Sequence, residues 1–186
     1  MTATVEQPVE VPGGGPRRPS HWRYVLIPVV VLFVVFWTWA LFFASKASIN
    51  RIGDRAWAAR AERICVAADA ERQALADFRE LDGGDTAMLA ERAAIVDRAT
   101  DIVTQMLDDV VAVAPSDAKG REIVPQWEAD YRIYLQDRRE YADRLRNGED
   151  VPFSETALDG IPISDKVEVF AGDNEMPTCA PPIDLS

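Results

Sequence analysis

An uncharged apolar run from Tyr24 to Ala44 is the strongest constraint that this sequence places on the fold. Its 21 residues would extend roughly 30 Å as an α-helix, which matches the hydrocarbon core of a lipid bilayer. Arg23 and Lys46 bound the run, and aromatic side chains suited to the headgroup region lie near both ends. The run predicts a transmembrane helix over residues 23–46, so the lipid bilayer is the first expected partner.

A cleaved secretory signal is the alternative explanation, since it also starts with basic residues and an apolar run. The apolar part of such a signal is usually about 7–15 residues long, shorter than the run in this chain. Ser45 and Ala47 are small enough for a cleavage site, but Lys46 between them makes a poor match. No cysteine near the run could accept a lipid. We therefore expect a retained anchor.

The basic residues alone do not determine the orientation of the anchor. Arg17, Arg18 and Arg23 precede the span, while a larger basic group follows it, comprising Lys46, Arg51, Arg55, Arg60 and Arg63. A simple count of Lys and Arg would therefore place the C-terminal part in the cytoplasm. Long domains, however, cross the membrane largely regardless of their charge, which makes this count weak evidence.

The two cysteines, Cys65 and Cys179, favour the opposite orientation. Both follow the apolar run, and an even pair in one compartment is typical of an oxidising space, where a disulfide persists. The alternative is a pair of buried thiols in a cytosolic domain. We predict a disulfide between them, in a plasma-membrane protein with a cytoplasmic N-terminus and an extracytoplasmic C-terminal domain.

The composition narrows the source and the partners. The chain has 17 Arg and 3 Lys and is rich in Ala, Val and Asp, a bias that GC-rich codons produce and that indicates a high-GC bacterium. After the apolar run that ends at Ala44, 17 basic and 29 acidic residues give a net charge of −12. Because such a domain would repel phosphate groups, nucleic acid is excluded as an expected partner.

Outside the span, the sequence divides into three parts of different character. Residues 1–22 are rich in proline and glycine and have few apolar side chains, which predicts a disordered cytoplasmic tail. Residues 47–148 carry apolar side chains at helical spacing. Residues 149–186 are broken repeatedly by Pro and Gly, so we expect an extended strap with one short helix, Asp165 to Phe170, capped by Ser164.

Three amphipathic helices are predicted within residues 47–148. Each has one apolar stripe, and they cover residues 52–81, 85–115 and 120–148. Asp85 suits an N-cap, Pro125 a kink or restart, and Gly148 a C-terminal stop. Three such helices joined by short turns pack most simply as an antiparallel bundle. The sequence thus predicts an all-α protein with one transmembrane helix, an antiparallel three-helix bundle and a Pro-rich C-terminal strap.

The sequence lacks the usual catalytic and metal-binding patterns. His21 is the single histidine and adjoins the predicted span, which excludes a Ser-His-Asp or Cys-His site in the domain. No Gly-rich phosphate loop and no Cys/His zinc spacing is present. Two carboxylate pairs, Asp97 with Asp101 and Glu140 with Asp143, have the spacing for a hard cation, but solvated acidic faces paired with arginine are the simpler explanation. We therefore expect no enzyme activity, metal or cofactor.

Tyrosine and arginine alternate along the third predicted helix. Both residue types are enriched at the energetic centres of protein interfaces. Five side chains therefore form a candidate partner interface, namely Tyr131, Tyr134, Arg138, Arg139 and Tyr141. The alternative is that the tyrosines belong to the core and the arginines balance neighbouring carboxylates.

A resemblance is carried by the run YLQDRREYADRLRNGED from Tyr134 to Asp150, together with FAGDNEMPTC near the C-terminus. Both segments are similar to uncharacterised single-pass membrane proteins of high-GC Gram-positive bacteria. The resemblance covers the anchor and most of the domain that follows it. It implies a location and an architecture, and it assigns no functional residue to this chain.

Two functions from different classes fit these features. The first is a non-enzymatic accessory or interaction protein, whose anchored, disulfide-strapped bundle meets a membrane or cell-envelope protein. The second is a helical-bundle domain that binds or senses a small ligand. A ligand pocket would need polar side chains pointing into the bundle. Because the predicted stripes are nearly all apolar, the sequence favours the interaction protein.

Overall fold

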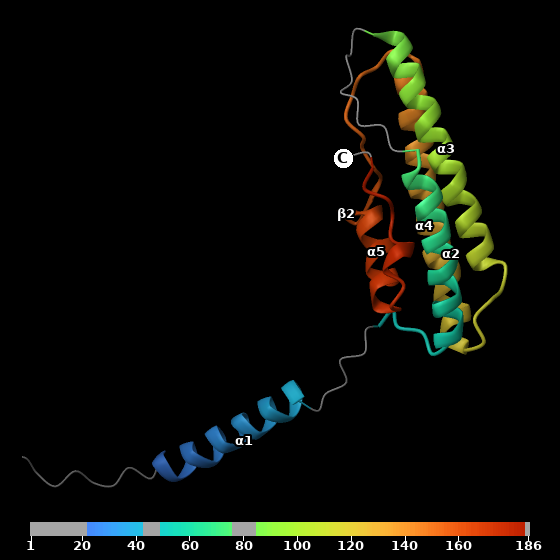
Figure 1. Ribbon diagram of the computed structural model, residues 1–186. Helices are drawn as coiled ribbons and strands as arrows, with labels where there is room; N and C mark the ends of the chain where they lie inside the picture. The colour runs from blue at the N-terminus through green and yellow to red at the C-terminus, as the bar shows by residue number, and fades with distance from the viewer. Residues whose placement is uncertain (1–21, 43–48, 76–84, 185–186) are drawn as a thin grey trace, which may run out of the picture. The chain divides into compact units, whose positions relative to one another are not determined.

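The computed structural model describes residues 22–42, 49–75 and 85–184, except for the side chains of residues 23 and 39–42. The chain divides into two compact units, Met1–Lys46 and Ala47–Ser186. Helices dominate the described residues (Figure 1), which confirms the prediction of an all-α protein. Apart from its last residue, the predicted N-terminal tail lies outside the described residues.

The first unit contains α1, Trp22–Phe42, which covers most of the apolar run. Its described apolar side chains are exposed, with Leu32 at 69% and Phe33 at 62%. Among the described residues there is no helix whose length and apolar character suffice for a membrane crossing. Lys46 and the side chain of Arg23, which bound the predicted span, lie outside that description. The transmembrane helix therefore stays a prediction.

The second unit contains three long helices followed by a small hairpin and two shorter helical elements. They are α2 (Arg55–Gln73), α3 (Thr86–Val111), α4 (Ala118–Arg146), β1 (Ala157–Leu158), β2 (Ile161–Pro162), α5 (Ile163–Asp173) and the 3₁₀ helix η1 (Pro177–Cys179). The two strands pair antiparallel, with Ala157 opposite Pro162. The three long helices overlap the three amphipathic stretches predicted from the sequence. α2 ends at Gln73, before the predicted end at residue 81, and residues 76–81 lie outside the described part of the chain.

Local signals explain where the long helices begin and end. The side chains of Asp54, Asp85 and Asp117 each accept hydrogen bonds from backbone N–H groups of the following helical turn, at 2.8–3.1 Å. These bonds satisfy amides that have no partner within the helix. Pro125 lies inside α4 without ending it, and α4 ends where Gly148 adopts a φ of +81°. The predicted roles of Asp85 and Gly148 are confirmed.

The C-terminal segment is part of the bundle, which corrects the prediction of a three-helix bundle covered by an extended strap. α3 packs against both α2 and α4, whereas α5 packs against α4 and η1 packs against α2 (Figure 1). Ile163, Val167, Phe170 and Met176 are buried in the main hydrophobic core together with residues of the three long helices. The physical reason is that three of these positions, 163, 167 and 170, lie at helical spacing and form an apolar stripe of their own.

The helix predicted at Asp165 to Phe170 is present but longer, and Ser164 is not its cap. Pro162 occupies the N-cap position and makes no side-chain capping bond. Instead, the backbone N–H and hydroxyl of Ser164 both donate to the carboxylate of Glu155, at 2.9 and 2.8 Å. Because the β1–β2 hairpin brings Glu155 back to the start of α5, a carboxylate from outside the helix satisfies its first turn.

Candidate functional site

A disulfide between Cys65 and Cys179 joins α2 to η1 inside the core. The Sγ atoms lie 2.02 Å apart, the Cα atoms lie 5.1 Å apart, and both residues are fully buried. This confirms the predicted cysteine pair. One turn earlier on α2, the carboxylate of Glu62 accepts hydrogen bonds from the N–H and hydroxyl of Thr178, at 3.1 and 2.6 Å. The C-terminal segment is thus held to α2 by a covalent and a polar contact.

A fully buried arginine lies beneath the residues that follow the disulfide, which we call the tail (residues 180–184). Nη1 and Nη2 of Arg138 donate to Oδ1 and Oδ2 of Asp184, at 2.6 and 3.2 Å. Nε of Arg138 donates to the hydroxyl of Thr100 on α3 at 3.0 Å. Arg72 on α2 donates to Oδ2 of Asp184 at 3.3 Å. Two arginines from two helices, here named the arginine clamp, therefore bind one carboxylate.

The ion pair keeps both partners charged, although Arg138 has no exposed side-chain surface and the side chain of Asp184 is only 26% exposed. Burial lowers the pKa of Arg138, but the hydrogen bond to Asp184 and the charge of Asp184 outweigh that effect and raise it overall. Burial likewise raises the pKa of Asp184, but the hydrogen bond from Arg138 and its charge lower it overall. Since an unpaired buried charge is costly, Arg138 depends on the tail for its partner.

Two tyrosines of α4 bind the backbone of the tail. The hydroxyl of Tyr134 donates to the carbonyl of Pro182 at 2.7 Å, and that of Tyr131 donates to the carbonyl of Ala180 at 3.4 Å. Burial raises the pKa of both phenols, so they remain protonated donors at neutral pH. Bonds to main-chain carbonyls at alternate residues recognise an extended backbone without requiring particular side chains.

Four of the five residues of the predicted partner interface lie in the core. Tyr131, Tyr134, Arg138 and Tyr141 are exposed by 6% or less, whereas the side chain of Arg139 is 38% exposed. The five therefore do not form one exposed surface. The physical reason is that positions 131, 134, 138 and 141 follow the spacing of a single helix face. That spacing is also the sequence signal that could have revealed the buried arginine.

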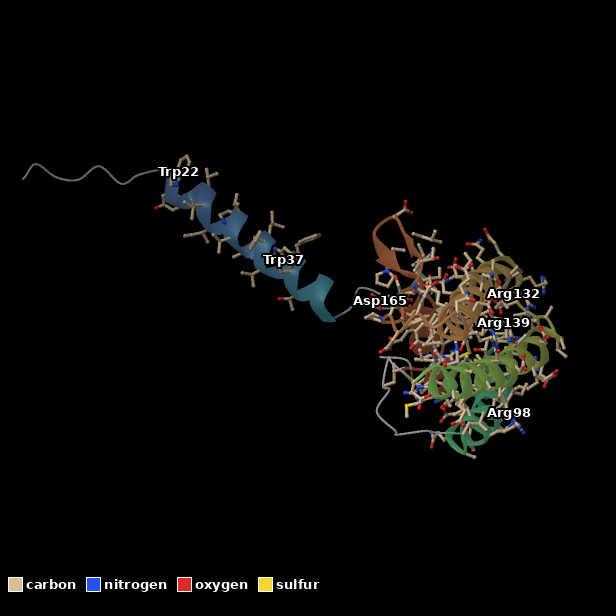
Figure 2. All side chains as sticks on the ribbon, turned by 90° about the horizontal axis from the view of Figure 1, so that it is seen from above. Trp22, Trp37, Arg98, Arg132, Arg139 and Asp165 are labelled. Carbon is tan, nitrogen blue, oxygen red and sulfur yellow. A yellow bond between two sulfur atoms is a disulfide. The ribbon has the colours of Figure 1, made fainter. Side chains whose placement is uncertain are left out.

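Arginines at heptad spacing form a line of ion pairs between α3 and α4. The pairs are Arg132–Asp108 at 2.9 Å, Arg139–Asp101 at 2.6 Å and Arg146–Asp97. Arg132 and Arg139 are labelled in Figure 2. The pairs follow one another in antiparallel order along the two helices. The carboxylates of Asp97 and Asp101, considered above for a cation, are thus engaged by arginines of the neighbouring helix.

The described part of the second unit carries several hollows. A groove of about 810 Å³ lies between α2 and α3 and is lined by apolar residues and charges of both signs, including Arg63, Ile64, Glu71, Arg98 and Met106. Arg98 is labelled in Figure 2. A hollow of about 320 Å³ lies beside the tail and is lined by residues that include Tyr134, Phe153, Glu155, Asp165 and Ile183. In the part of the chain that the structure describes, no group of three or more His, Cys, Asp or Glu is placed to hold a metal ion.

Comparison with known proteins does not suggest a function for this chain. No family model, curated protein or solved structure matches this chain. The resemblance to single-pass membrane proteins of high-GC Gram-positive bacteria therefore stays a prediction. The functional proposal rests on the arginine clamp, the two phenols and the tail that they bind.

Proposed function

We propose that this protein is a non-enzymatic, membrane-anchored interaction protein that presents its helical domain outside the cytoplasm. The observation that carries this proposal is a polar site that binds an extended peptide, the tail, through the guanidinium of Arg138 and the hydroxyl of Tyr134. The pKa values of both groups are raised, so both act as hydrogen-bond donors and not as bases. Peptide recognition suits such donors better than catalysis does.

Two features support the proposed location. The uncharged sequence from Tyr24 to Ala44 has the length of a bilayer span, and α1 covers it as far as Phe42. The Cys65–Cys179 disulfide would persist in an oxidising compartment, which favours the outer side of the plasma membrane for the second unit. We propose a single-pass protein with a cytoplasmic N-terminus and a membrane or cell-envelope protein as its partner.

Protease treatment of intact spheroplasts tests the topology. A C-terminal tag should be lost when protease is added, while an N-terminal tag on the same protein should survive. Survival of the C-terminal tag before lysis would contradict the proposed orientation. A version without residues 24–44 serves as the control, because it should leave the membrane fraction.

Photo-crosslinking in native membranes tests the interaction. Val113 and Val169 are 56% and 54% exposed and suit a photoreactive residue, and buried Val103 provides the matched control. A discrete adduct from an exposed position, identified by mass spectrometry, is the expected result. The absence of any protein adduct from both exposed positions and from Arg98 in the groove would argue against an interaction protein.

A small-ligand-binding domain is the second candidate, because polar side chains do point into the bundle. Arg138 and Thr100 are fully buried, and the hollow of about 320 Å³ adjoins the tail above them. A thermal-shift screen with small carboxylates tests this function. Stabilisation by such a compound, without a crosslinked protein partner, would favour ligand sensing over protein interaction.

A further inference from the structure

We infer that the arginine clamp is the docking site for an extended, carboxylate-bearing peptide of a partner protein, and that the tail occupies this site as an intramolecular ligand. The inference rests on the proposed interaction function and names the site and the chemistry of its partner. Its elements are Arg72, Arg138 and the hydroxyls of Tyr131 and Tyr134.

The contacts of the tail are those of a peptide ligand. The phenols bind its main-chain carbonyls at residues 180 and 182, and the clamp binds one carboxylate two residues later. Ile183, between the last two contacts, is 87% exposed. The site therefore recognises an extended backbone and one carboxylate, and it has little selectivity for the remaining side chains. A segment of a second protein with those two features would make the same bonds.

The architecture allows the tail to leave while the domain stays folded. The disulfide at Cys179 and the contact of Glu62 with Thr178 hold the chain up to the last helical element. The tail begins immediately after these two anchoring points, so its release leaves both points in place, while Arg138 loses its partner carboxylate and becomes open to another one. A void of about 30 Å³, lined in part by Arg72, Tyr131 and Pro182, lies at the tail. Packing at this position is therefore incomplete.

Charge defines the peptide further. The sequence after the apolar run has a net charge of −12, so a strongly acidic segment would be repelled by most of the domain. The clamp supplies two positive groups at one point. The fitting partner is therefore an extended segment with a single carboxylate, as in the tail itself. Since the tail is tethered, its effective concentration is high, and a partner peptide competes best when the tail is weakened.

Fluorescence anisotropy with a labelled, C-terminally amidated peptide Ac-APPIDLS-NH2, the sequence of residues 180–186, tests the inference on the full chain in lipid nanodiscs; amidation leaves the Asp side chain as the only carboxylate of the peptide. Asp184→Asn removes the charge that holds the tail and keeps its shape. Asp159→Asn is the matched control, since Asp159 is an exposed turn residue with a φ of +55°, which Asn tolerates. We expect the Asp184→Asn protein to bind the peptide at least about tenfold more tightly than the wild-type or control protein.

The peptide with Asn in place of Asp should bind at least about tenfold more weakly to the Asp184→Asn protein, because it brings no carboxylate to the clamp. Equal binding of the two peptides, or no binding to a folded Asp184→Asn protein, would overturn the inference. Folding of each variant is verified by its thermal unfolding transition before the titration.

A second measurement uses the unaltered chain and covers the case in which Asp184→Asn does not fold. Carboxypeptidase digestion of the wild-type tail is followed by mass spectrometry, with and without excess peptide. The Asp-containing peptide should accelerate digestion several-fold by displacing the tail, and the Asn-containing peptide should not. Unchanged digestion would overturn the inference. Neither assay depends on topology or crosslinking, so its failure would leave the proposed function standing.

Discussion

Arg138 and Arg139 are neighbours on α4, yet they belong to two different faces of the domain. Each has a nitrogen 2.6 Å from a carboxylate oxygen, Arg138 with Asp184 and Arg139 with Asp101. The side chain of Arg138 has no exposed surface, whereas that of Arg139 is 38% exposed. An exposed ion pair contributes about 0–1 kcal/mol, while breaking a buried pair costs about 3–5 kcal/mol. Burial, and not the length of the contact, therefore decides what each arginine contributes.

Charge reversal should give the largest difference in stability between variants of Arg138 and variants of Arg139. Arg138→Glu would bury a carboxylate beside Asp184, and we expect a loss of about 3–5 kcal/mol in the free energy of unfolding, or failure to fold. Arg139→Glu should change it by no more than about 1 kcal/mol. Pulse proteolysis of the full chain across a urea gradient measures both. Similar losses for the two variants would remove the distinction between the faces.

Removing the disulfide should destabilise the bundle, because the disulfide lies in the core. Because Cys65 and Cys179 lie in the main core, replacing both with Ala should lower the free energy of unfolding of the whole bundle by about 2–4 kcal/mol. The control is the wild-type chain with reductant, which should approach the variant in stability. An unchanged urea midpoint, with loosening confined to the tail, would show that the bundle does not depend on η1.

Double-mutant cycles should measure how strongly each arginine is coupled to its own carboxylate. The cycle of Arg138→Met with Asp184→Asn should give a coupling free energy of about 1.5–3 kcal/mol, typical of hydrogen bonds to charged groups. The matched cycle of Arg139→Met with Asp101→Asn should stay below about 1 kcal/mol. The unfolding free energies of seven proteins provide the data, because the two cycles share the wild type. Equal couplings would mean that solvent reaches the clamp as freely as it reaches the outer ion pairs.

Lowering the pH should have the smallest effect on stability, and it acts through the Arg138–Asp184 pair. The pKa of Asp184 is lowered in the folded state, so its contribution to stability is fully present above the ordinary carboxyl pKa. It is lost as pH falls through the lowered value, since the unfolded state then binds more protons. The stability gap between wild type and Asp184→Asn should therefore narrow at acidic pH. Asp54, whose pKa is lowered to about 2, titrates in both proteins and cancels in the difference.

The stability difference between wild type and Asp184→Asn could instead stay constant down to the pH at which the protein unfolds in acid. That result would contradict a stabilising role for the charge of Asp184. Thermal unfolding of the two proteins across a pH series provides the measurement. The Asp159→Asn protein is the control, because it also removes one carboxylate, from an exposed turn.

Local patterns predicted a large part of the fold. Helical periodicity indicated the three long helices, Asp85 and Gly148 marked ends that the structure confirms, and the even cysteine count predicted the disulfide. The C-terminal segment was predicted as mostly extended with one short helix; that helix is present, but the Pro and Gly residues around α5 obscured its full length and its packing in the core. Ser164 was wrong as a cap because α5 already begins at Ile163, and Ser164 donates its own N–H and hydroxyl to Glu155, nine residues earlier.

The sequence by itself determined the all-α class, the amphipathic faces and the pairing of the two cysteines, since each depends on spacing within a helix or on a residue count. It did not determine the environment of Arg138, which lies in a stripe of core positions but carries a charge. Its partner Asp184 is 46 residues away, and Arg72 reaches the same carboxylate across 112 residues. Only the tertiary structure decided that the tail covers this stripe, because burial of a charge depends on which distant segment supplies its counter-charge and excludes water.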